Sequence, residues 1–185
     1  MSLELILGPM FAGKSTEAIR RIRTFQSEGL PYLVITSTSD TRYDPTGKSI
    51  NTHSRLSVPA IALASLQPLL SMDEFEKATH IVIEEAQFFP DLYDTVMEMV
   101  EKRRKCVFVF GLDGDSERRP FGQVVNLIPV ADTYIKLKAE CRLCDDRKAA
   151  LFTKRLSAYR EQVCVGGDET YQAVCRNHYL EPMRV

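Results

Sequence analysis

One eight-residue segment constrains this chain more than any other, because it joins an apolar strand pattern to an amphipathic helix pattern. It fits G-x-x-x-x-G-K-[ST] and reads Gly8-Pro9-Met10-Phe11-Ala12-Gly13-Lys14-Ser15. In such a loop, glycines let backbone N–H groups turn toward phosphate oxygens at the positive end of the following helix dipole. We expect Lys14 to reach the β- and γ-phosphates, Ser15 to bind Mg²⁺ and Thr16 to help begin the helix. The segment therefore predicts an ATP-using phosphotransferase.

Short apolar runs that alternate with helical patterns predict an α/β fold. The runs are rich in β-branched and aromatic residues and cover residues 3–7, 32–36, 80–84, 106–110 and 133–137. Apolar residues recur at helical spacing after Ser15 and over residues 91–105. This order predicts a mostly parallel sheet with helices on both faces and ligands at the carboxyl ends of the strands. Two long stretches, 37–57 and 153–171, are expected to be functional loops.

The composition is that of an ordinary globular protein, with 44% hydrophobic residues, 26% charged residues and a formal net charge of −1. This balance gives no reason to expect nucleic acid or an anionic membrane as a partner. No apolar run approaches the roughly 18 residues of a membrane span. The chain also runs into its first strand pattern without the charged segment of a signal peptide, so we expect a cytoplasmic protein.

Two adjacent glutamates, Glu84 and Glu85, end the third apolar run. A phosphate-loop enzyme needs an acidic group near its Mg²⁺ at the end of a neighbouring strand. Because side chains alternate along a strand, we expect one glutamate to serve the metal ion and the other to face an acceptor hydroxyl. A solvated strand end is the structural alternative. Phe88 and Phe89 either stack against a flat ligand or pack in the core.

The last quarter of the chain holds the pattern of a metal site. Cys141-x-x-Cys144 and Cys175-x-x-His178 are separated by thirty residues and supply three thiolates and one imidazole. This spacing predicts zinc, and four protein ligands indicate a structural site that holds both ends of the 153–171 stretch. The alternative is a group of buried free thiols, which the paired spacing disfavours.

Two other classes of phosphate-loop protein fit the sequence less well. A nucleic-acid-dependent ATPase with a zinc ribbon requires a basic stripe with interleaved aromatic residues, and the charge balance disfavours it. A GTP-dependent switch requires a guanine-reading Asn/Thr-Lys-x-Asp segment, which the sequence lacks.

The motifs taken together resemble one known family. Gly8 to Thr16, Asp40-Thr41-Arg42-Tyr43, Glu84 to Phe89, Gly111-Leu112-Asp113-Gly114 and the four metal ligands occur in the order of thymidine kinases of the cytosolic, zinc-containing type (type II). The resemblance implies transfer of the γ-phosphoryl group of ATP to the 5′-hydroxyl of thymidine, with Mg²⁺ and a structural Zn²⁺. It further implies a RecA-like P-loop domain over residues 1–138, a zinc-binding and thymidine-binding lasso domain over 139–185, a homotetramer, and feedback inhibition by thymidine triphosphate.

The resemblance also assigns residues. Glu85 matches the general base, and Glu84 matches the Mg²⁺-linked position. The residues expected to bind ATP are Gly8, Pro9, Met10, Phe11, Ala12, Gly13, Lys14, Ser15, Thr16, Asp40, Arg42, Glu84 and Gln87. Those expected to bind thymidine are Met10, Phe88, Leu112, Phe121, Thr153, Arg155, Gln162, Val163, Cys164, Val165, Gly166 and Tyr171.

This chain departs from the family pattern in three places. Glu84 stands where the family usually has Asp, Ser116 stands where some relatives have an aromatic residue, and residues 145–148 are longer and more charged. The acceptor also stays open between thymidine and another pyrimidine nucleoside such as deoxyuridine.

Overall fold

A six-stranded parallel sheet lies at the centre of the protein, in the strand order β5-β2-β6-β7-β1-β8. The structure is a computed structural model that describes residues 1–39, 49–51, 57–157, 161–164 and 166–182. The strands are β1 (Ser2–Leu7), β2 (Tyr32–Ser37), β5 (Ile61–Leu63), β6 (His80–Ile83), β7 (Cys106–Gly111) and β8 (Thr133–Lys136). The predicted parallel α/β fold is confirmed, and the short edge strand β5 is an addition to the prediction.

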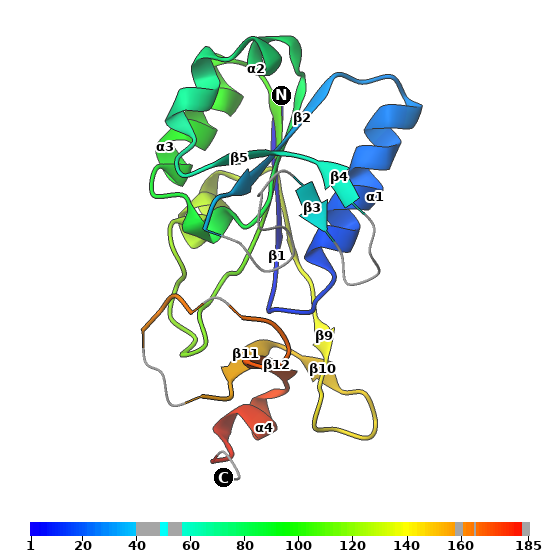
Figure 1. Ribbon diagram of the computed structural model, residues 1–185, viewed down its shortest axis with the longest axis vertical. Coiled ribbons are helices and arrows are strands. Elements are labelled where there is room, and N and C mark those ends of the chain that lie inside the picture. The colour runs from blue at the N-terminus through cyan, green and yellow to red at the C-terminus, as the bar shows by residue number, and fades with distance from the viewer. Residues whose placement is uncertain (40–48, 52–56, 158–160, 165, 183–185) are drawn as a thin grey trace.

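Successive strand residues point to opposite faces of this sheet, and apolar residues lie on both faces. Helices therefore cover both faces. Leu5 and Val107 point to one face, which α2 and α3 cover together with a short 3₁₀ helix, η1. Ile6 and Phe108 point to the other face, which α1 covers. Figure 1 shows α1 on one side of the sheet and α2 and α3 on the other. These helices are α1 (Lys14–Ser27), η1 (Gln67–Ser71), α2 (Asp73–Lys77) and α3 (Leu92–Met97).

The predicted α-helix over residues 91–105 is wrong in its second half. The α-helix α3 ends at Met97, and a π-helical turn, η3 (Glu98–Lys102), follows it. The Arg103 N–H donates to the carbonyl of Glu98 at 3.0 Å, which is the wider i→i+5 ring of a π turn. None of the helices in the described part of the chain is both long enough and apolar enough to cross a membrane.

The parallel register brings several strand ends to one edge of the sheet. Leu7 pairs with Gly111 across β1 and β7, and Ile83 pairs with Ile35 across β6 and β2. Consequently the phosphate-binding loop, the Glu84-Glu85 pair with its 3₁₀ turn η2 (Ala86–Phe88), and the segment that begins at Leu112 all leave the sheet on the same side.

The C-terminal part of the chain lies beyond this edge (Figure 1) and packs around its own small apolar cluster. It contains the strand pairs β9–β10 and β11–β12 and the short helix α4. The expectation of a loop over residues 153–171 is wrong at both ends, because Thr153, Lys154 and Arg155 pair with Tyr171 to Ala173 in a hairpin stem. The elements are β9 (Ala139–Glu140), β10 (Ala149–Ala150), β11 (Phe152–Arg155), β12 (Tyr171–Val174) and α4 (Arg176–Leu180), with η4 (Val124–Val130) before β8 and a separate β3–β4 pair (Ser49–Asn51, Ser57–Pro59).

Candidate active site

The phosphate-binding loop has the backbone that an anion site requires. Gly13 has φ +82°, a left-handed backbone conformation that favours glycine. A Cβ built there would meet no atom within 4 Å, so glycine is needed here for the backbone conformation and not for space. Gly8 is needed for space, since a Cβ there would lie 2.6 Å from the carbonyl oxygen of Leu137. Helix α1 begins at Lys14, whose Nζ donates to the carbonyls of Pro9 at 2.8 Å and Gly8 at 3.3 Å. The loop thus places a lysine and a helix N-terminus at one point.

Glu84 lies in the interior beside this loop. It is 2% exposed; its Oε2 accepts a hydrogen bond from the Glu85 N–H at 3.1 Å, and its Oε1 has no hydrogen-bond partner within the described ranges. Burial and repulsion from Glu85 raise the pKa of Glu84 to about 7, although Ser15 and Lys14 act in the opposite direction. A buried carboxylate oxygen in need of a partner, next to a serine and a lysine, fits a divalent cation carried by a nucleotide.

Glu85 turns away from Glu84 and lines a separate pocket. The turn is sharp because Glu85 adopts a left-handed backbone conformation with φ +51°. Its Oε2 accepts a hydrogen bond from Gln87 Nε2 at 2.5 Å, and Gln87 Oε1 accepts one from the Leu112 N–H at 3.0 Å. Gln87 is 3% exposed, so a buried amide joins the Glu85 carboxylate to the end of β7.

The pocket collects most of the residues that were expected to bind the acceptor. Its apolar walls are Met10, Leu112, Phe121 and Tyr171, with Phe88 packed against them. The rings of Phe88 and Phe121 meet edge to face with centroids 5.6 Å apart, whereas Phe89 is 1% exposed within the main core. The full lining is Met10, Ser39, Glu85, Gln87, Phe88, Leu112, Gly114, Asp115, Ser116, Phe121, Thr153, Arg155, Gln162, Val163, Cys164, Gly166 and Tyr171.

The hairpin stem shapes the lasso segment, residues 161–164, where it crosses the pocket. Buried Arg155 donates from Nη1 to the carbonyl of Glu161 at 2.7 Å and from Nη2 to that of Gln162 at 3.2 Å. Tyr171 accepts from Arg155 at 3.0 Å and donates to the carbonyl of Cys164 at 2.7 Å. Thr153 Oγ1 accepts from the Met10 N–H at 2.9 Å. The stem therefore holds both the lasso segment and the phosphate-binding loop.

Gln87 lines the pocket beside Glu85, and three other predicted residues lie outside the part of the chain that the structure describes. Gln87 was expected among the ATP-binding residues, but its side chain bonds to Glu85 and Leu112 as described above. Asp40, Arg42 and Val165 lie outside the described residues.

Sequence reasoning missed the turn that begins at Gly114, which supplies Asp115 to the pocket wall. The Asp115 side chain is 1% exposed, and Gln162 Nε2 donates to its Oδ2 at 2.9 Å. Hydrogen bonds from Arg119 and Gln162 hold the pKa of Asp115 below its ordinary value in spite of its burial. An aspartate after glycine in an irregular segment is an ordinary turn residue, so no local signal marked it.

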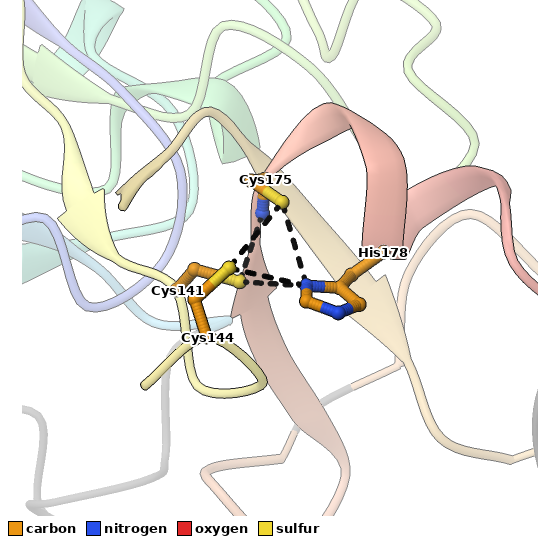
Figure 2. Close-up of side chains that lie close together, drawn as sticks. All are labelled: Cys141, Cys144, Cys175 and His178. Atoms are coloured by element: carbon orange, nitrogen blue, oxygen red, sulfur yellow. Dashed lines mark hydrogen bonds between the residues drawn. The ribbon is translucent and has the colours of Figure 1, made fainter. Parts of the chain in front are cut away.

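The four predicted metal ligands lie together, as Figure 2 shows. The Sγ atoms of Cys141, Cys144 and Cys175 are each 3.4 Å from His178 Nδ1, and the Sγ atoms of Cys144 and Cys175 are 3.8 Å apart. All four ligand atoms lie within 4.8 Å of one another. The Cys175 N–H donates to Cys141 Sγ at 3.2 Å, a contact that supports a thiolate. The cluster can hold a metal ion.

Comparison with known proteins gives one consistent result. The family model described as thymidine kinase matches residues 1–179. Thymidine kinase a of Arabidopsis thaliana is 40% identical over 182 residues, which cover 97% of this chain and 75% of that protein. The cytosolic thymidine kinase of Homo sapiens is 40% identical over 179 residues, covering 97% and 73%, and the thymidine kinase of monkeypox virus is 38% identical over 179 residues, covering 97% of both.

Proposed function

Because the chain belongs to the thymidine kinase family, we propose that it transfers the γ-phosphoryl group of ATP to the 5′-hydroxyl of thymidine. One observation carries this proposal: two adjacent carboxylates leave the same strand end, Glu84 toward the phosphate-binding loop and Glu85 into the neighbouring pocket. A kinase needs such a division between a donor site and an acceptor site.

In the proposed reaction Glu85 is the general base. The carboxylate takes the proton from the 5′-hydroxyl as that oxygen bonds to the γ-phosphorus, and the bond to the β–γ bridging oxygen breaks. The products are thymidine monophosphate and ADP. Gln87 holds the carboxylate in the orientation that this transfer requires, because its amide is itself fixed by Leu112.

The donor side uses the loop and Glu84. We propose that backbone N–H groups between Gly8 and Ser15 bind the phosphates and that Lys14 moves from the loop carbonyls to the phosphate oxygens. Ser15 and Glu84 would hold Mg²⁺, which neutralises charge on the phosphates when bound. Glu84 Oε1, which is buried and has no hydrogen-bond partner among the described residues, supports this assignment. Glutamate at this position is one methylene longer than the family's usual aspartate.

On the acceptor side, we propose that the pyrimidine ring lies against Phe88 between the lasso segment and the walls of Met10, Leu112, Phe121 and Tyr171. Thymidine carries few charges, so backbone groups around the flat ring and space for its methyl group would set selectivity. Deoxyuridine lacks only that methyl group and is the alternative acceptor.

The metal cluster is proposed to be a structural zinc site. An ion at about 2.3 Å from three sulfurs and about 2.0 Å from an imidazole nitrogen places a tetrahedral sulfur–nitrogen pair about 3.5 Å apart and two sulfurs about 3.8 Å apart. The observed spacings of 3.4 and 3.8 Å fit this set. His178 Nε2, on the far side of the ring, is 4.0 Å from Glu181 Oε1, which is longer than the hydrogen bond by which an outer carboxylate orients a metal-bound histidine.

Larger-scale properties are also proposals. A domain boundary between residues 138 and 139 is supported by the separate apolar cluster of the C-terminal part. A homotetramer is supported by strand β8, an edge strand whose residues are all exposed, Tyr134 by 43% and Ile135 by 38%. Cytoplasmic location, feedback inhibition by thymidine triphosphate and the absence of nucleic-acid and membrane partners are proposed from the resemblance to the family and from the composition.

A nucleoside panel with labelled ATP tests the function. We expect phosphate on thymidine, with deoxyuridine as the only other acceptor, and Mg²⁺ dependence. Glu85→Gln should lose most turnover but still bind thymidine, because only the proton acceptor is removed. Transfer to purine nucleosides alone, or full turnover in Glu85→Gln, would contradict the proposal.

A further inference from the structure

The turn of residues 114–120 is built around a single buried carboxylate. Gly114 and Pro120 pair across its base, the Asp115 N–H donates to the Arg119 carbonyl, and the Arg118 N–H donates to the Asp115 carbonyl. Inside it, Asp115 Oδ1 accepts from the N–H groups of Glu117 and Arg119, each at 2.9 Å. The turn thus fixes the orientation of the Asp115 carboxylate without help from the rest of the protein.

The second oxygen of that carboxylate faces the lasso segment. Asp115 Oδ2 accepts one hydrogen bond from Arg119 Nε and one from Gln162 Nε2, both at 2.9 Å. Gln162 Nε2 also lies 3.4 Å from the carbonyl of Pro120. The backbone of Gln162 is held from the opposite direction, because Arg155 of the hairpin stem binds its carbonyl.

Both members of this contact line the acceptor pocket, and 47 positions separate them in sequence. The turn belongs to the segment after β7, whereas Gln162 belongs to the C-terminal part. Their hydrogen bond therefore joins two parts of the pocket wall that come from distant segments of the chain. A hydrogen bond to a charged acceptor is stronger than one between neutral groups, so this contact can hold the lasso segment against the turn.

We propose that Asp115 and Gln162 form a latch that holds the lasso segment over the bound nucleoside. They are positioning residues: the pair sets how tightly and how long the acceptor is held and takes no part in phosphoryl transfer. This inference rests on the proposed function, since it concerns the acceptor pocket of a nucleoside kinase.

The test measures thymidine affinity and release in the full-length protein. Gln162→Leu keeps the size of the side chain but removes its donor, and Arg119 still satisfies Asp115, so the turn is not disturbed. We expect the dissociation constant and KM for thymidine to rise about tenfold, the low end for loss of a charge-assisted hydrogen bond. Faster thymidine release should accompany this change, with the KM for ATP unchanged.

A reversal of donor and acceptor separates a latch from a general packing effect. Gln162→Glu alone places two carboxylates together and should weaken thymidine binding further. In Asp115→Asn with Gln162→Glu, the Asn oxygen can accept the two backbone N–H groups while its amide donates to the new carboxylate. Arg119 Nε, which loses its acceptor at residue 115, can donate to that carboxylate as well. We expect this double variant to recover affinity to within about threefold of the starting protein, a coupling that only interacting residues show.

Gln26→Leu is a matched control, because it removes a side-chain hydrogen bond of 2.8 Å to Tyr32 on the exposed face of α1. It should leave thymidine affinity unchanged. Unchanged affinity in Gln162→Leu, or a double variant weaker than Gln162→Glu, would overturn the latch. Failure of the unsubstituted protein to bind or phosphorylate any pyrimidine nucleoside would instead overturn the proposed function.

Discussion

Replacement of Gln87 by leucine tests whether a buried amide orients the proposed base. Gln87 is 3% exposed and makes two hydrogen bonds, one to Glu85 and one from the Leu112 N–H. Gln87→Leu fills similar space but breaks both contacts. The change should therefore affect stability through Leu112 and turnover through Glu85.

The two effects have different sizes. A buried N–H left without an acceptor costs about 1–3 kcal/mol, so the free energy of unfolding should fall by about that amount in urea titration. A general base contributes about 10²–10⁴ to rate, and loss of its orientation removes part of that. Since the contact to a charged carboxylate is worth about 1.5–3 kcal/mol, we expect kcat to fall about 10–100-fold.

Gln87→Glu provides the matched control. It keeps an oxygen that can accept from Leu112, so stability should fall less than in Gln87→Leu. It also places a second carboxyl group against Glu85, which raises the pKa of the pair because two adjacent charges repel. The acid limb of the kcat/KM profile should then move to higher pH, since the base works only when deprotonated.

Both variants are assayed by ADP release from about pH 5 to 9 over thymidine concentrations that extend from below KM to saturation, so that kcat and kcat/KM are both obtained. A kcat in Gln87→Leu within twofold of the starting protein would refute the orienting role. An unshifted pH profile in Gln87→Glu would refute the direct contact between residue 87 and Glu85.

Three further predictions concern burial and the metal cluster. Burial raises the pKa of Glu84 from 4.5 to about 7, so the folded state binds more protons than the unfolded state between these pH values. The free energy of unfolding should therefore fall by about 3 kcal/mol as pH rises from 4.5 through 7. Glu84→Gln without nucleotide or Mg²⁺ should flatten that decline in urea titrations, and an equal decline would refute the assignment. Cys141→Ala should remove one equivalent of zinc by metal analysis and weaken thymidine binding more than ATP binding, whereas purified protein that never contained zinc would contradict the site. Lys105→Met should lower the unfolding free energy by about 2–3 kcal/mol, because it breaks hydrogen bonds of 3.0 and 2.7 Å to the carbonyls of Glu76 and Ala78 at the end of α2. Turnover per folded molecule should be retained. Calorimetry measures the change, and an unchanged melting temperature would contradict the prediction.

The parts of the fold that could be predicted have local causes. Strands β6 and β7 are almost entirely apolar, and β1 is apolar apart from Ser2 and Glu4, because both faces of the sheet are covered; α1 carries a regular apolar stripe. Strand β5 has three residues, too few to show a period, and it is a strand only because β2 lies beside it. The π turn after Met97 likewise has no period of its own in the sequence.

The same distinction separates the predicted and unpredicted parts of the site. The phosphate-binding loop and the two Cys-x-x-Cys/His pairs are short motifs in which the sequence spacing determines how the residues are arranged in space. Asp115 and Gln162 are polar residues in irregular segments, and their pairing depends on how the C-terminal part packs against the edge of the sheet. The contact of Gln87 with Glu85 is local in sequence, but the orientation of the Gln87 amide depends on Leu112, the residue after β7.

The metal cluster has a wider structural reach than its position in sequence implies. His178 is followed by Tyr179, whose hydroxyl donates to the carbonyl of Ser116 at 2.8 Å. Arg118 of the same turn lies 4.3 Å above the Tyr179 ring. Helix α4 therefore contacts the turn that carries Asp115, while β12, which leads into Cys175, forms the stem beneath the lasso segment. Because both sides of the latch rest on elements that the metal ligands join, loss of the metal should loosen both acceptor walls together. It should also weaken the contact of the Met10 N–H with Thr153 in the stem, while α1 and β1 continue to hold the rest of the phosphate-binding loop.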